Sequence, residues 1–232
     1  MITAAEQATS RYAAVTLGSL VLLVLWDSFG FDLELARGWG DAGGFALRHH
    51  WLLAHWLHDL IKPLPWILTI GLIVMAARPP RGFAASSLIR RWQWPLSALA
   101  CSIAVGVLKA ASGSSCPWDL TEFGGTGAYA SHWRGWLEHD GGPGRCFPAG
   151  HATNGFAFIG GWFALRATYP KAARVVLVAS LCVGGLLGYV QQIRGAHFIS
   201  HTVWTLWICW TVAWMVDLAI ERREGRIALR SR

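Results

Sequence analysis

Apolar residues form long runs along this chain, and short polar segments separate the runs. Each run approaches the roughly 20 residues that a helix needs to cross a bilayer. The pattern therefore predicts an all-α polytopic membrane protein with six transmembrane helices in a single integral domain, residues 1–232. The predicted spans are Tyr12–Phe31, Pro63–Ala77, Trp92–Lys109, Ala149–Arg166, Arg174–Gln191 and Phe198–Ile220.

The first run has a second interpretation, because an early positive charge followed by an apolar stretch is also typical of a signal peptide. Here the run continues through Trp26 into Asp27, and no small-residue cleavage site stands nearby. We therefore expect a retained first helix.

Composition and charge agree with a membrane protein. The chain is 54% hydrophobic and 14% charged, whereas soluble domains carry roughly 25% charged residues. The net charge of +7 would suggest a nucleic-acid partner if the basic residues formed one surface, but 13 of the 20 fall in the terminal and inner segments. Such a bias is the positive-inside pattern. It predicts cytoplasmic N- and C-termini in a bacterial inner membrane, contact with membrane lipids and no nucleic acid.

The two outer segments differ in character. In residues 32–62, Leu52, Trp56 and Leu60 alternate with histidines, which predicts an amphipathic helix at the membrane interface. Metal binding by these histidines is the alternative. The segment 110–147 is rich in glycine and acidic residues, so it is too polar to cross the membrane.

Five cysteines divide by position. Three lie within predicted spans, where a small apolar side chain is the expected role. Cys116 and Cys146 flank the second outer segment. In an oxidising periplasm they are disulfide candidates, and their bond would close a loop of about 30 residues and contribute roughly 3–4 kcal/mol.

Three polar patches lie at predicted span ends on this outer side: Lys109 before Cys116, residues 147–151, and residues 194–201. Lys109 and Arg194 would then face a helix that begins at Gly150, whose free amides and dipole favour an anion such as a phosphoryl group. A histidine can attack phosphorus and a second can protonate the leaving oxygen. His151 and His197 lie on different helices, and His201 is one turn beyond His197, where it can orient that ring.

Simpler interpretations exist for each patch alone. A single histidine at a helix start is more often a cap than a catalyst, and the pair His197 and His201 has the spacing of half a metal site. The cations nearby would repel a metal ion. The coincidence of all three patches on one side favours phosphate chemistry.

At these residues the chain resembles the type 2 phosphatidic acid phosphatase superfamily. That family carries the motifs Lys-x6-Arg-Pro, Pro-Ser-Gly-His and Ser-Arg-x5-His-x3-Asp. The first corresponds to Lys109 with Cys116-Pro117, the second to Pro148-Ala149-Gly150-His151, and the third to His197 with His201 in place of the aspartate. The resemblance implies that His197 is the nucleophile, His151 the acid, and Lys109 and Gly150 phosphate ligands. It also implies that no cofactor or metal is required.

The departures from these motifs concern the missing guanidinium and carboxylate groups. Cys116 and Gln191 stand where the family has arginine, and we expect Arg145 and Arg194 to replace the lost guanidinium groups. The missing carboxylate requires another outer acid, with Glu122 and Asp119 as candidates.

The sequence thus predicts a membrane lipid phosphatase with a periplasmic site, acting on an isoprenyl diphosphate, lipid A or a glycerophospholipid phosphate through a phosphohistidine. Three alternatives stay open: a lipid phosphotransferase, a non-catalytic phospholipid-binding or scaffold protein, and a metal-handling protein.

Overall fold

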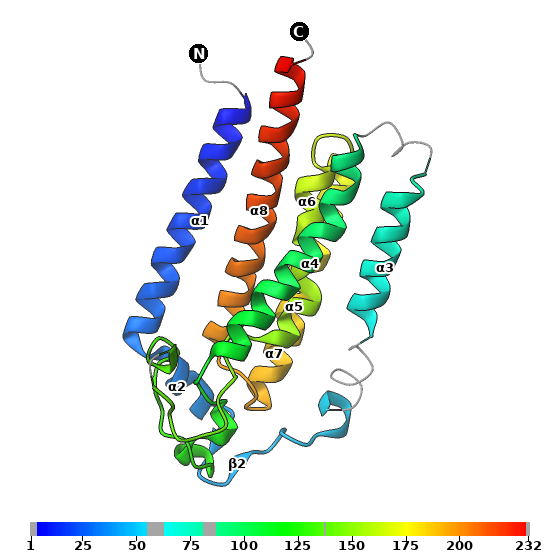
Figure 1. Cartoon of the computed structure of the whole chain (residues 1–232). Helices are drawn as coiled ribbons and strands as arrows, with labels where there is room; N and C mark the ends of the chain where they lie inside the picture. Colours follow the sequence, from blue (N-terminus) through cyan, green and yellow to red (C-terminus); the bar gives the residue numbers. More distant parts are fainter. Residues whose placement is uncertain (1–3, 55–62, 81–86, 137, 231–232) are drawn as a thin grey trace.

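A computed structural model describes residues 4–54, 63–80, 87–136 and 138–230 of the chain. It is a bundle of helices with one short hairpin, as the apolar runs predict (Figure 1). The longer helices are α1 (Ala4–Phe29), α3 (Leu64–Ala77), α4 (Leu88–Ala111), α7 (Pro170–Ile193) and α8 (Ile199–Arg230). The shorter elements are α2 (Phe31–Arg37), β1 (Gly40–Asp41), β2 (Gly44–Phe45), η3 (Pro117–Asp119), η4 (Thr121–Phe123), η5 (Arg134–Trp136), α5 (Gly150–Phe156), η6 (Ala157–Ile159) and α6 (Gly160–Leu165).

Four helices of the described chain are long and apolar enough to cross a membrane, against the six predicted spans. They contain Gln7–Phe29, Leu88–Ala111, Pro170–Ile193 and Ile199–Arg226. α3 is apolar but has 14 residues, which at 1.5 Å per residue is shorter than a hydrocarbon core. The predicted span Ala149–Arg166 is interrupted by η6, so it is two short helices, α5 and α6. That the chain crosses the membrane six times remains a prediction.

The first outer segment also differs from its prediction. It contains α2 and the β1–β2 hairpin, where Gly40 pairs with Phe45. A helical turn begins near His50, whose carbonyl accepts from the Leu53 and Ala54 amides. Most of the predicted interfacial helix, including Trp56 and Leu60, lies outside the described residues.

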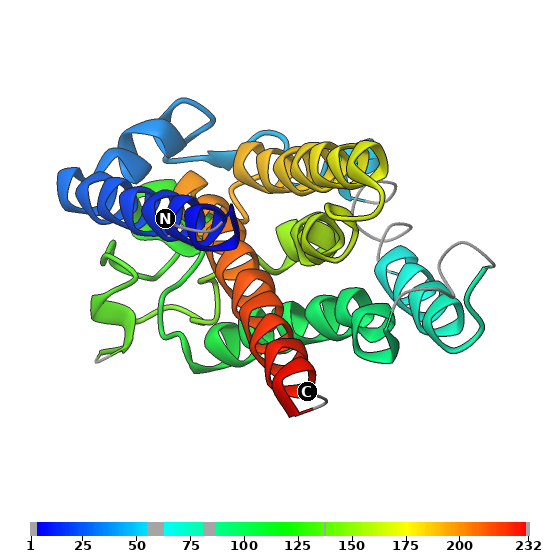
Figure 2. The same ribbon diagram turned by 90° about the horizontal axis from the view of Figure 1, so that it is seen from above.

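The core lies along α8, which runs through the middle of the bundle with α1, α4 and α7 around it (Figure 2). Val105, Phe156, Phe163 and Ile208 are buried together between α4, the α5–α6 segment and α8. Large apolar side chains on the outer faces are exposed instead, for example Leu22 at 68%. Exposed apolar faces of this extent suit contact with lipid.

Glycine allows a close approach between α5 and α7. A Cβ on Gly155 would stand 2.2 Å from the backbone nitrogen of Gly184. Only glycine at both positions lets α5 pack directly on the backbone of α7. This contact carries the start of α5 close to the end of α7.

The two ends of the bundle differ chemically. Both chain termini lie at one end (Figure 1), and toward that end α8 carries Asp217, whose side chain is 1% exposed. Asp217 accepts from Arg90 at 3.0 Å, Gln93 at 2.8 Å and Arg166 at 2.6 Å. A buried carboxylate requires such partners. The opposite end carries the segment between α4 and α5, and the candidate site lies there.

Candidate functional site

The segment between α4 and α5 is closed on itself at its two ends. Cys116 and Cys146, the pair expected from the sequence, form a disulfide with their Cα atoms 5.1 Å apart. The Arg145 amide donates to the Ser112 carbonyl at 2.7 Å, and the Cys146 amide donates to the Ser114 carbonyl at 2.9 Å. These bonds hold the residues before α5 directly beside the residues after α4.

The turn that begins α5 is fastened to α8. The Ala149 amide donates to the His201 carbonyl at 3.2 Å, and the Thr205 hydroxyl donates to the Ala149 carbonyl at 3.1 Å. Ala149 offers no side-chain cap to α5, so the first amides of this helix keep their donor capacity. A Cβ on Gly150 would lie 3.5 Å from Lys109 Cδ. The lysine stem therefore passes across the start of α5.

The three candidate histidines gather at this turn. The ring centroids of His151 and His197 are 6.4 Å apart, and those of His197 and His201 are 5.8 Å apart. His197 is 3% exposed and His201 is 2% exposed, while His151 is half-buried. Burial holds the pKa of His197 well below its usual 6.5, and positive charge at Lys109, His201 and His151 lowers it further. His197 is therefore neutral at neutral pH, as a nucleophile requires.

The disulfide touches the His197 ring. Cys146 Sγ lies 3.4 Å from His197 Nδ1. A disulfide sulfur has no proton and acts only as a weak acceptor, so this contact favours the tautomer with the proton on Nδ1. The lone pair then lies on Nε2. Both sulfurs and a ring nitrogen of His197 lie within 4.8 Å of one another, but sulfurs bonded to each other are not thiolate ligands, so this group does not suit a metal.

The two arginines of the prediction have different surroundings. Arg194 is 7% exposed, and its guanidinium donates to the Arg48 carbonyl at 3.1 and 3.2 Å and to Gln191 at 3.1 Å. These bonds hold the first outer segment against the end of α7. Arg145 is exposed in a left-handed conformation, φ 57°. The phosphate contacts expected for both arginines remain predictions.

His201 lies between two histidines rather than beside a carboxylate. Its ring meets His197 on one side and His132 on the other, with centroids 5.7 Å apart. His132 Nε2 in turn lies 3.2 Å from Asp27 Oδ2. The two acids considered from the sequence lie elsewhere, since Glu122 accepts from Arg37 and Asp119 from Trp118.

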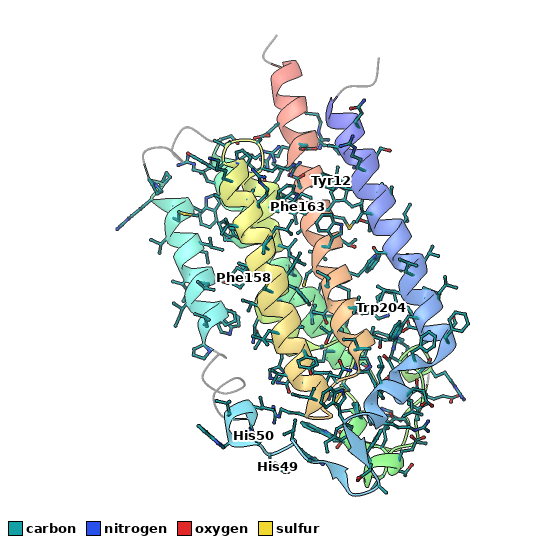
Figure 3. All side chains as sticks on the ribbon, turned by 180° about the vertical axis from the view of Figure 1, so that it is seen from behind. Tyr12, His49, His50, Phe158, Phe163 and Trp204 are labelled. Atoms are coloured by element: carbon teal, nitrogen blue, oxygen red, sulfur yellow. A yellow bond between two sulfur atoms is a disulfide. The ribbon has the colours of Figure 1, made fainter. Side chains whose placement is uncertain are left out.

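Sequence reasoning missed the pair Asp27 and His132. Asp27 gave a signal, because an acid at the end of an apolar span is costly without a purpose. His132 gave no such signal, since no motif or charged cluster next to it in the sequence indicates a functional role. The Trp204 ring lies beside His132, with centroids 6.2 Å apart. His49 and His50 lie well away from Trp204 in Figure 3, so the described histidines of the first outer segment belong to a separate region.

Two cavities lie near the end of α4. One, of about 220 Å³, lies between α3, α4 and α5, and its lining includes Trp66, Leu99, Lys109 and Gly150. The other, of about 380 Å³, lies beyond the end of α4, and its lining includes Ala110, Glu138, His139 and Arg145. Lys109 thus lines a mainly apolar space among the helices, and the residue after it lines a polar space in the outer segment.

Comparison with known proteins adds one match. The family model described as PAP2 superfamily matches residues 92–224, which include most of α4, the outer segment between α4 and α5, α5 to α7 and most of α8. The chain has no significant match among curated proteins or among solved structures.

Proposed function

This chain belongs to the PAP2 superfamily, and we propose that it is a membrane phosphatase that hydrolyses a phosphomonoester or diphosphate on an amphiphilic lipid. Membership of a family of phosphatases supports hydrolysis of a phosphate ester. The observation that carries the proposal is the convergence of His197, His151 and Lys109 around Gly150. These are the residues that match the family motifs, and they come from three different helical regions.

The proposed reaction has two in-line steps. Nε2 of His197 attacks phosphorus and forms the N–P bond while the bond to the leaving oxygen breaks, and His151 donates a proton to that oxygen. Water then attacks phospho-His197, gives its proton to His151 and releases inorganic phosphate. Lys109 and the α5 amides stabilise the charge on the phosphoryl oxygens, so no metal is needed at phosphorus.

The cavities support a lipid substrate. The space between α3 and α4 is lined mainly by apolar side chains, and Lys109 is part of its lining. A hydrocarbon chain in this space would place its phosphate beside the lysine and the start of α5. An isoprenyl diphosphate, lipid A or a glycerophospholipid phosphate has this form.

Phosphate release by the purified protein tests the assignment. We expect release from one or more members of a panel of lipid phosphates and diphosphates, with a loss of at least about 1000-fold in His197→Ala and in His151→Ala. His139→Ala, an exposed histidine of the same outer segment, is the matched control and should keep full activity. Equal turnover in the wild type and both site variants would reject the site, and binding without turnover would favour the non-catalytic alternative.

We further propose a bacterial inner membrane location with the site facing the periplasm and both termini in the cytoplasm. The disulfide beside the site supports an oxidising compartment. In a Cys182→Ser background, a membrane-impermeant maleimide added to intact cells with a permeable outer membrane should label His139→Cys but not Arg222→Cys. The opposite pattern would invert the proposed topology.

A further inference from the structure

A group of buried ligand atoms lies on the far side of His201 from the candidate site. It comprises Asp27 at the end of α1, Asp32 in α2 and His132 before η5. A carboxylate oxygen of each aspartate and a ring nitrogen of His132 lie within 4.8 Å of one another. The side chains of Asp27 and His132 are 3% and 4% exposed, and Asp32 is 6% exposed. Two neighbouring helices and a residue about 100 positions further along the chain thus bring their donor atoms to one place.

The charges of this group are unbalanced. Among the described residues, these two carboxylates form one ion-pair contact, between Asp27 and His132, and it is an ion pair only when His132 is protonated. No lysine or arginine of that part of the chain pairs with either acid. Two buried carboxylates in close proximity disfavour each other's ionised form unless a cation or a proton compensates them. A divalent cation would neutralise both at once.

Several buried polar atoms face the same small cavity without a hydrogen bond. Asp27 Oδ1, His201 Nδ1 and Ser114 Oγ have no hydrogen-bond partner, and His132 Nε2 has only its 3.2 Å contact with Asp27 Oδ2. Their residues line one cavity of about 10 Å³. That volume accommodates about one ion or water molecule. His132 Nε2 lies 3.2 Å from Asp27 Oδ2 yet forms no hydrogen bond with it, as expected if its lone pair is directed at a third atom.

The carboxylates are held in the way that metal ligands usually are. Asp27 Oδ2 accepts from the indoles of Trp133 at 3.0 Å and Trp204 at 2.9 Å, and Oδ1 is left without a hydrogen bond. Asp32 accepts from the Trp26 indole at 3.2 Å and from the Ser200 amide at 3.1 Å. Hydrogen bonds of this kind orient the side chains that bind a metal ion directly, and they are typical of metal centres.

We propose that Asp27, Asp32 and His132 bind one divalent transition-metal ion, Zn²⁺ in the first instance. Imidazole nitrogen and carboxylate oxygen are both ligand types that Zn²⁺ accepts, whereas Ca²⁺ and Mg²⁺ prefer oxygen ligands alone. The ion would join α1, α2 and the outer segment, and through Asp32 and Ser200 it would reach the start of α8. It would support the position of His197 without contacting phosphate, so the site does not depend on the proposed phosphatase activity.

Metal content of the full-length protein in detergent is the direct test. After purification in zinc-containing buffer and extensive dialysis, we expect about one zinc per chain by mass spectrometry. Asp27→Asn and His132→Gln should lower the affinity for Zn²⁺ by at least about 100-fold. His139→Gln and His197→Ala are matched controls for the other histidines and should retain the ion.

A measurement on the wild type alone covers the case in which a variant fails to fold. Metal-depleted wild type should gain the visible absorption of tetrahedral Co²⁺ on titration, and Zn²⁺ should abolish it. Zinc retained equally in Asp27→Asn and His132→Gln would overturn the proposal. So would a wild type that holds no more zinc than His132→Gln and shows no Co²⁺ absorption.

Discussion

The disulfide offers the sharpest test of how this structure supports its site. Replacing Cys116 and Cys146 with serine opens a loop with a sequence separation of 30 residues. Loop-closure entropy for that length corresponds to about 3.5 kcal/mol at 25 °C. For a chain of 232 residues, a loss of this size lowers the unfolding temperature by about 7–14 °C.

The same change should affect catalysis, because the bond does more than close a loop. Cys146 Sγ contacts Nδ1 of His197 at 3.4 Å, and the paired cysteines fix the residues that lead into α5. Loss of the bond should therefore lower kcat more than it raises KM, since it disturbs the proposed nucleophile rather than the proposed lipid-binding space.

Thermal unfolding and steady-state kinetics in detergent measure both effects. Wild type, reduced wild type and the Cys116→Ser, Cys146→Ser variant are compared, and reductant added to the double variant controls for the three free cysteines. Reduced wild type and the variant should behave alike. If both unfold within about 2 °C of the oxidised protein, the argument that this bond constrains the outer segment is refuted.

Three further predictions concern other parts of the molecule. Burial holds the pKa of His197 well below 6.5, and the neutral form is the proposed nucleophile. The midpoint of the acid limb of kcat/KM against pH should therefore lie below pH 6.5. A midpoint at or above that value would contradict the burial of the ring. Gly155→Ala should destabilise the protein by at least about 1–3 kcal/mol, because its Cβ would stand 2.2 Å from the backbone of α7. A Cβ on Gly185 would have nothing within 4 Å, so Gly185→Ala should unfold at or slightly above the wild-type temperature. Equal changes in unfolding temperature for the two glycine variants would disprove the close packing. Asp217→Asn should cost about 1.5–3 kcal/mol, because it weakens the charge-assisted hydrogen bonds to a buried carboxylate while Arg90 and Arg166 keep Glu224 and Glu221 as partners. Glu138→Gln removes an exposed pair and should change stability by less than about 1 kcal/mol; chemical denaturation compares the two.

Hydropathy was sufficient to locate the longest helices, because an apolar run long enough to span a bilayer is rarely found outside membrane-spanning helices. It did not predict the interruption of the segment 149–166. There the close approach of Gly155 to Gly184 depends on the partner helix, and local sequence does not reveal which partner a helix will have.

The candidate site was predictable where its chemistry is local. Lys109, His151 and His197 each stand in a short motif, so motif order and membrane side together predicted that they meet. The surroundings of Arg194 were not predictable, because its hydrogen bonds to Arg48 require the first outer segment to fold back across α7.

The sequence by itself determined the all-helical class and the family, since hydropathy and motif chemistry are written along the chain; the phosphate-handling roles of its motif residues remain predictions. Only the tertiary structure decided that His201 lies between His197 and His132, and that Asp27 from the first helix reaches His132. The physical reason is that burial makes an unpaired carboxylate costly, so its partner is selected by proximity in the folded protein, across 105 positions of chain that no local pattern connects.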